Sequence, residues 1–159
     1  MKKQISIIFL TTTLLLSCDS NKVFEKNIYT NKKGWSHLEK PKFKIEITDT
    51  TSLMNILLNV RHSSNYLFSN LWVQINTTNP DGVVFIDTVE CLLAKKNGRW
   101  LGDGFGHIWD LQTHVKTQKF KRKGEYFFEL EQAMRYGNQA QIKVLPEIIA
   151  VGIRIEKAN

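Results

Sequence analysis

Short segments of alternating apolar and polar residues, separated by turn signals about every ten residues, make up most of the chain beyond Pro41. Such alternation is typical of half-buried β-strands, because successive side chains point to opposite faces. The sequence offers seven or eight such segments and at most one short helix. It therefore predicts an all-β chain folded as an antiparallel β-sandwich, either a jelly roll or an immunoglobulin-like fold. The clearest candidate strands are residues 43–49, 52–62, 70–78, 83–94, 105–120, 125–132 and 148–157.

Two of these segments have well-defined inward faces, and two parts of the chain are ambiguous. Residues 52–62 read as a strand, although their apolar run also suits a short helix. Residues 131–141 are compatible with one or two helical turns that stop at Gly137. The inward faces are Phe43, Ile45 and Ile47 in the first strand and Val151, Ile153 and Ile155 in the last.

The first seventeen residues form an export signal. Lys2 and Lys3 precede an apolar, hydroxyl-rich run that is too short and too close to the terminus for a spanning helix. The run ends in LLSC at residues 15–18, the lipobox pattern of a bacterial lipoprotein. We therefore expect residues 1–17 to be removed and Cys18 to be diacylated, since two or more acyl chains anchor a protein stably where one binds weakly.

The remaining residues fit one domain with an N-terminal tether. Residues 18–40 are polar with scattered aromatics and show no sustained period, so we expect them to link the lipid to the domain. Residues 41–159 then form a single β-sandwich, because the 142 residues left after the signal fall within the range of one hydrophobic core.

The chain is modestly basic. Loss of Lys2 and Lys3 with the signal lowers the net charge from +7 to +5. An exported chain without a recognised nucleic-acid motif is not expected to bind nucleic acid. We expect the densest basic group to be a solvated turn, with contact to an anionic membrane or an acidic partner as the alternative. That group is Lys119, Lys121, Arg122 and Lys123.

Four glycines fall within nine positions of the stretch GRWLGDGFGHIW, residues 98–109. A phosphate-binding loop needs its glycines between a strand and a helix, whereas the residues that follow here continue in a strand-like pattern. We instead expect the cluster to bend a strand around the end of the sandwich. Asn97-Gly98 predicts a tight hairpin, with Trp100 and Leu101 beginning the return strand.

No catalytic or metal-binding pattern is present in the sequence. It contains no HExxH, CxxC or G-x-S-x-G motif. Cys91 lies in an apolar run, so we expect a buried free thiol and no disulfide once Cys18 is acylated. The sequence thus predicts a non-enzymatic protein with no metal, no small-molecule substrate and no cofactor beyond the covalent lipid on Cys18.

Aromatic side chains are the better lead to a binding surface. Exposed rings on a β-sandwich can stack on sugars or anchor a protein partner, with core packing as the alternative for each ring. The candidate contact residues are Trp72, Trp100 and Trp109. We expect Trp100 and Trp109 to reach the surface, because glycines flank them.

A series of sequence blocks resembles the gliding-motility lipoprotein family GldH. The blocks are YLFSNLWVQI, DGVVFIDTVE, GRWLGDGFGHIWD, GEYFFELEQAMR and GIRIEK, in the order and spacing of that family and preceded by the lipobox. The resemblance covers most of the mature chain and is looser around VFEKN and GWSH. No single block is a catalytic signature, so Cys18 is the only functional residue that the resemblance identifies.

The resemblance implies a lipid-anchored cell-envelope component of the gliding machinery, linked to type IX secretion. Its expected partners are other envelope proteins of that apparatus, and the membrane through the anchor. We expect the domain to face the periplasm, and the sequence leaves open which membrane holds it. The alternative is a periplasmic or surface glycan-binding module that uses the tryptophans named above.

Overall fold

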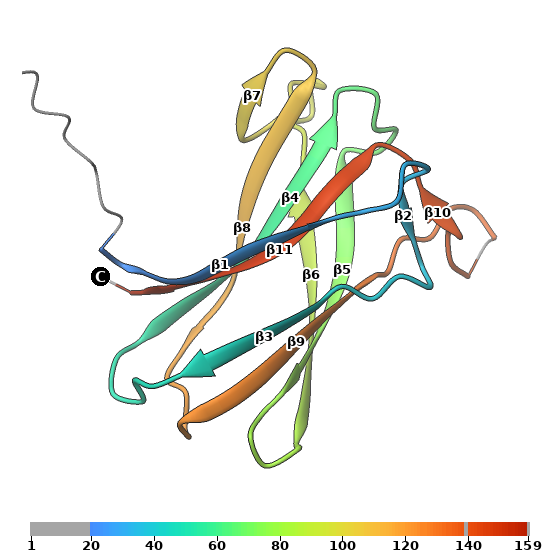
Figure 1. The fold of residues 1–159 in the computed structure, drawn as a ribbon. Helices are drawn as coiled ribbons and strands as arrows, with labels where there is room; N and C mark the ends of the chain where they lie inside the picture. The colour runs from blue at the N-terminus through green and yellow to red at the C-terminus, as the bar shows by residue number, and fades with distance from the viewer. Residues whose placement is uncertain (1–19, 139, 159) are drawn as a thin grey trace, which may run out of the picture.

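The computed structural model describes residues 20–138 and 140–158, which form two antiparallel β-sheets packed face to face (Figure 1). Within these residues there is no helix, and therefore none that could cross a membrane. The predicted all-β sandwich is confirmed. The expected signal peptide and Cys18 lie outside the described residues. The strands are β1 (Lys22–Tyr29), β2 (Trp35–Ser36), β3 (Lys42–Ile47), β4 (Met54–Ser63), β5 (Asn70–Thr78), β6 (Val84–Leu92), β7 (Asp103–Phe105), β8 (Ile108–Gln118), β9 (Gly124–Gln132), β10 (Val144–Leu145) and β11 (Ile148–Lys157).

The order of the strands is that of a jelly roll. One sheet has the order β1-β11-β4-β8-β7 and the other β3-β9-β5-β6, with β2 and β10 forming a separate short pair. The antiparallel pairs are nested in the sequence: β1 pairs with β11, β3 with β9, β4 with β8, and β5 with β6. Such a folded double ribbon distinguishes the jelly roll from the immunoglobulin-like alternative.

The core lies between the sheets, on the faces that the alternation predicted. Residues 52–62 adopt the strand conformation rather than the helical one, as part of β4. Both predicted inward faces are buried, and the Cys91 thiol is buried and free as expected. Burial raises the pKa of this thiol to about 11, so it stays protonated at neutral pH. The largest fully buried side chains are Trp35, Phe43, Phe120, Phe128, Ile45, Ile47, Met54, Ile56, Leu58, Leu71, Ile75 and Leu93.

Much of the expected tether, residues 18–40, is instead part of the folded domain. β1 pairs with β11 along its length, so the sheet begins at Lys22. The sequence signal is weak because β1 is an edge strand. Only Phe24 and Ile28 of its inward face are apolar and pack against the core, with Lys26 between them. Pairing with a distant strand, rather than the local pattern, decides this element.

Trp35 connects the same segment to the core. Its side chain is fully buried, and its Nε1 donates a hydrogen bond of 2.9 Å to the Glu39 carbonyl oxygen. The preceding Gly34 has φ +109°, and a Cβ there would lie 2.1 Å from the carbonyl oxygen of Leu145. A glycine is therefore required where β2 approaches β10.

The glycine cluster forms a hairpin rather than a bend in one strand. β7 pairs with β8 through a two-residue turn that begins at Gly106, whose φ is +63°. Gly102 also has a positive φ, and a Cβ there would lie 2.1 Å from the Asp110 carbonyl oxygen. The predicted return strand at Trp100 and Leu101 is absent: Asn97-Gly98 does turn the chain, but Trp100 makes only an isolated bridge to Ala94.

The possible helical turns in residues 131–141 are not formed in the described part of this segment. β9 continues to Gln132, whose buried side chain holds the chain that follows. Its Nε2 donates to the Ile142 carbonyl oxygen, and its Oε1 accepts from the Met134 amide at 3.1 Å. The Ile142 amide in turn donates to the Met134 carbonyl oxygen at 3.0 Å. A side-chain amide thus closes the loop where the sequence suggested a helix.

Candidate functional site

Polar side chains are aligned across four strands on the outer face of the five-stranded sheet. Cross-strand pairing brings residues of β1, β11, β4 and β8 to the same level of that face. Two small residues of β11 lie at the centre. Two levels, read from β1 to β8, are Tyr29, Ala150, Arg61 and Asp110, and then Asn27, Gly152, Asn59 and Gln112.

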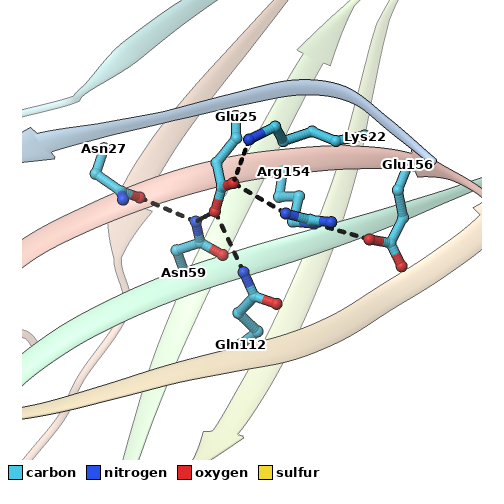
Figure 2. A network of polar contacts seen from close by, with 7 residues as sticks. All are labelled: Lys22, Glu25, Asn27, Asn59, Gln112, Arg154 and Glu156. Carbon is cyan, nitrogen blue, oxygen red and sulfur yellow. Dashed lines mark hydrogen bonds and ion pairs between the residues drawn. The ribbon is translucent and has the colours of Figure 1, made fainter. Parts of the chain in front are cut away.

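Glu25 on β1 is the centre of a polar network on this face (Figure 2). Its carboxylate accepts hydrogen bonds from Arg154 at 2.9 Å, from Asn59 at 3.0 Å and from Gln112 at 3.3 Å. Arg154 also donates to Glu156 at 2.7 Å, so its guanidinium lies between two carboxylates. These bonds connect β1 to the three neighbouring strands and hold the edge strand in place.

Asn59 has a fixed orientation and one unsatisfied atom. Its Nδ2 donates to Glu25 Oε1 and to Asn27 Oδ1, both at 3.0 Å. Because the Glu25 carboxylate can only accept, the Asn59 amide cannot be flipped. The residue is 8% exposed, and its Oδ1 accepts no hydrogen bond from any described residue. A buried acceptor without a partner is unfavourable by about 1–3 kcal/mol.

The small residues of β11 leave a polar depression of about 250 Å³ above the sheet. A Cβ at Gly152 would lie 1.9 Å from Asn27 Oδ1 and 2.5 Å from the Lys26 carbonyl oxygen, so only glycine lets Asn27 lie across β11. We call this hollow the polar depression. It is lined chiefly by Asn27, Tyr29, Asn59, Arg61, Asp110 and Gln112.

An ion pair forms one wall of the polar depression. Arg61 donates to both carboxylate oxygens of Asp110, with Nε–Oδ1 at 2.7 Å and an Nη–Oδ2 distance of 2.9 Å. The bond to Asp110 raises the pKa of the Arg61 guanidinium. Tyr29 lies beside it, with its hydroxyl 3.4 Å from the guanidinium and the residue 69% exposed. Two-point pairing fixes the direction of both charged groups.

A second surface lies on the outer face of the four-stranded sheet, along β5 and β6. Alternate residues of β6 point outward, and its apolar members Val84, Ile86 and Leu92 are all exposed. Trp72 on β5 is 38% exposed and lines a hollow of about 500 Å³ together with Tyr136. We call these five residues the β5–β6 surface.

The other half of the same face is charged. Lys42 pairs with Glu129 at 3.3 Å and Lys44 with Glu125 at 2.5 Å, between β3 and β9. Such exposed pairs contribute little to stability and keep the surface hydrated. The exposed large apolar side chains on the strands of this face are therefore those of β6 and Trp72 of β5.

The three candidate tryptophans do not share a surface. Trp72 lies on the β5–β6 surface, whereas Trp109 belongs to β8 of the other sheet and lies over Gly104, where a Cβ would be 2.7 Å from its ring. Trp100 packs on buried His62, with ring centroids 4.7 Å apart. Trp100 and Trp109 are both half-buried.

The polar depression could not be predicted from the sequence, because its residues come from four separate strands.

His62 is a buried titratable group behind Trp100. Its Nδ1 lies 2.9 Å from the Ser63 carbonyl oxygen, and its Nε2 has no partner among the described residues. Burial lowers the pKa of the His62 imidazole below its usual value. The neutral ring packs between Trp100 and Tyr66.

We expect this histidine to make the fold less stable at mildly acidic pH. The free energy of unfolding should fall as pH drops below about 6.5, because the unfolded chain binds a proton that folded His62 resists. The slope contributed is at most about 1.4 kcal/mol per pH unit. Urea unfolding at pH 7.5, 6.5 and 5.5 should show a smaller loss for His62→Gln than for the wild type. Equal losses would contradict a role for His62.

Among the described residues no three His, Cys, Asp or Glu side chains gather as metal ligands would. The Ser63 hydroxyl donates to Glu147, and the Nδ1 of His62 bonds the Ser63 carbonyl oxygen rather than this hydroxyl, so His62 and Ser63 do not form a base–nucleophile pair.

Solved structures give only weak fold similarity. The crystal structure of dimeric latent PorU from Porphyromonas gingivalis matches 86% of this chain and 13% of its own, with 7% identity and a TM-score of 0.36. The VP2 subviral particle of infectious bursal disease virus matches 96% of this chain and 37% of its own, with 16% identity and a TM-score of 0.38.

Sequence relatives are far more informative. The chain is 32% identical to a gliding motility lipoprotein GldH homolog of Christiangramia forsetii, covering 100% of this chain and 99% of the relative. It is 31% identical to gliding motility lipoprotein GldH of Flavobacterium johnsoniae, covering 99% and 98%. The GldH lipoprotein family model matches residues 22–155, from the first strand to the last. The expected resemblance is thereby confirmed, and the chain belongs to the GldH lipoprotein family.

Proposed function

We propose that this protein is a lipid-anchored component of the gliding machinery in the cell envelope, linked to type IX secretion, and that it acts by protein–protein contact through the β5–β6 surface. The names of the two relatives support the gliding role. The observation that carries the mode of action is the exposure of Val84, Ile86 and Leu92 on β6, which is the last strand of its sheet.

An uncovered apolar edge strand is unusual in a protein that acts alone. Edge strands are normally protected by lysines, prolines or bulges, because their free backbone groups can pair with another chain. β6 is paired in regular register with β5 and contains neither lysine nor proline, and its one inward-facing charge, Asp87, is paired with Lys116 of β8 at 2.5 Å. An extended segment of a partner can add to such an edge, with backbone hydrogen bonds giving affinity and side-chain contacts giving specificity.

The rings beside β6 supply the kind of side chain that dominates binding energy. Tryptophan, tyrosine and arginine are enriched among residues whose truncation greatly weakens a complex. Trp72, Tyr136 and Arg135 line one hollow next to the apolar strand. We assign this hollow to the partner of β6 rather than to a separate ligand.

The short distance between the lipid and the sheet supports a position close to the membrane surface. β1 begins at Lys22, four residues after Cys18. Asn21 accepts a hydrogen bond from Lys157 at the end of β11, so the start of β1 and the C-terminal strand lie at one end of the sandwich (Figure 1). The basic loop between β8 and β9 lies at the same end of the five-stranded sheet, because Gln118 and Lys157 both pair with Met54. This end is therefore suited to face anionic headgroups on the periplasmic side.

The proposal is tested by complementing a deletion strain of the bacterium that encodes the chain. We expect the wild type to restore colony spreading and the secreted proteome, and Cys18→Ala to fail at equal abundance. Ile86→Lys should also fail while remaining lipidated, since it puts a charge on the apolar contact. The matched control is Leu38→Lys, an exposed leucine away from the β5–β6 surface.

Cross-linking in whole cells gives the molecular readout for the same variants. A cross-linked partner should be captured by the wild type and lost in Ile86→Lys, and Trp72→Ala should weaken its affinity by about 30-fold or more. Full spreading and secretion with Ile86→Lys would reject the β5–β6 surface. A deletion without effect on spreading or secretion would reject the gliding role itself.

A further inference from the structure

The polar depression on the five-stranded sheet is not used by the proposed protein contact, which lies on the opposite sheet. Its unpartnered atoms are of mixed type. Asn59 Oδ1 is a buried acceptor without a partner, and neither the Nδ2 of Asn27 nor the Oε1 of Gln112 bonds to a described residue. A ligand that fills the depression must therefore both donate and accept hydrogen bonds.

The charges of the depression favour a neutral ligand. Arg61 is paired with Asp110, and Glu25 is paired with Lys22 and with Arg154, which it shares with Glu156. A phosphate or carboxylate would approach the carboxylates of Glu25 and Asp110, and an amine would approach the two guanidinium groups. The depression therefore complements neither an anionic nor a cationic ligand. A ligand hydroxyl group can both donate to a free acceptor and accept from a free donor.

Tyr29 adds a ring at the edge of the depression. It is 69% exposed, and its hydroxyl contacts Arg61 at 3.4 Å, which holds the phenol beside the polar groups. An aromatic face packs well against the apolar face of a sugar ring, while its hydroxyl stays available for hydrogen bonding. The volume of about 250 Å³ lies below the range for drug-sized ligands, so it suits one or two sugar units.

We propose that the polar depression is a carbohydrate-binding site for a neutral glycan of the cell envelope or cell surface, with Tyr29 stacking on a sugar ring and Asn27 and Gln112 binding its hydroxyls. This site differs from the tryptophan-based glycan surface suggested by the sequence, since none of the three tryptophans lines it. It can be occupied while the β5–β6 surface holds a protein, because the two lie on different sheets.

The test is calorimetric titration of the mature chain, residues 18–159 with Cys18→Ser, against neutral hexasaccharides. The probes are chitohexaose, cellohexaose, maltohexaose and mannohexaose, with polygalacturonate and inorganic phosphate as anionic comparisons. We expect at least one neutral probe to bind and the anionic ones not to bind. Tyr29→Ala and Asn27→Ala should each weaken that binding by about tenfold or more, because the first removes the stacking contact and the second removes a hydrogen-bonding group.

Trp72→Ala is the control for a ring on the other sheet, and it should leave sugar affinity unchanged. Melting temperatures should show that Tyr29→Ala remains folded, as its exposure implies. The proposal is overturned if no neutral probe binds at millimolar concentration, if Tyr29→Ala binds as the wild type does, or if Trp72→Ala loses affinity equally. None of these outcomes bears on the proposed protein contact through the β5–β6 surface, which is tested separately by colony spreading and cross-linking.

Discussion

Trp35→Ala is expected to lower the free energy of unfolding by about 3–5 kcal/mol, as large-to-small changes of buried aromatic side chains do. The indole is fully buried, so its removal leaves a cavity that the neighbouring strands cannot fill by small shifts. It also removes the hydrogen bond from Nε1 to the Glu39 carbonyl oxygen. Urea unfolding followed by circular dichroism measures the change directly.

The matched control for Trp35→Ala is Trp72→Ala, a tryptophan with much of its surface in water. We expect the control to lose about 1 kcal/mol or less, as surface substitutions usually do. If Trp35→Ala were no more destabilising than Trp72→Ala, the segment before β3 would be a detachable tether. The boundary of the domain would then return to Pro41.

Gly152→Val is expected to destabilise the fold by about 1–3 kcal/mol, the range for overpacked positions. The new Cβ would lie 2.5 Å from the Lys26 carbonyl oxygen, and a backbone atom cannot rotate away as the Asn27 side chain can. β1 must therefore separate from β11. Hydrogen exchange should report this as faster exchange of β1 amides, while the amides of β5 and β9 stay protected.

Thr88→Val controls for adding a β-branched apolar residue to a strand. Thr88 is exposed on the outer face of β6 and makes no contact with β1, so its substitution should leave β1 protection unchanged. Unchanged unfolding and unchanged β1 exchange in Gly152→Val would contradict the close approach of the two strands.

The β5–β6 surface and the polar depression lie on different sheets of the sandwich. The outer face of β5 and β6 exposes Trp72, Val84, Ile86 and Leu92, as expected for a protein partner, whereas the outer face of β1, β11, β4 and β8 is polar and hollowed at its small residues. If both proposals hold, the lipid anchor places one domain where it can contact the membrane, an envelope protein and a glycan at the same time.

Most core strands could be predicted, because a local alternation of apolar and polar residues indicates which of their side chains are buried. Phe43, Ile45 and Ile47 alternate with charged residues, and the structure buries all three. β5 was predicted with its observed bounds, residues 70–78. Alternation with a period of two residues predicts burial correctly wherever one face of a strand packs on the core and the other is exposed to water.

Elements held by distant partners were predicted less well. β1 was expected to be a tether, because Lys26 on its inward face interrupts the apolar–polar alternation. Its stability comes instead from pairing with β11 and from the Glu25 network. The glycine cluster was expected to bend a strand, although Gly102 and Gly106 turn the chain so that β7 pairs with β8. The hydrogen bonds that decide β1 join distant segments, whereas those of the β7–β8 hairpin are local and depend on a two-residue turn that the sequence reading did not identify.

The sequence by itself determined the all-β class, the inward faces of the long strands and the family, since these rest on alternation, turn chemistry and an ordered series of blocks. Only the tertiary structure decided the jelly-roll order, the start of the domain at Lys22 and the polar depression. The physical reason is that the depression is assembled from single residues on four strands, aligned by cross-strand register. Register is a property of pairing between distant segments, and no single segment carries it.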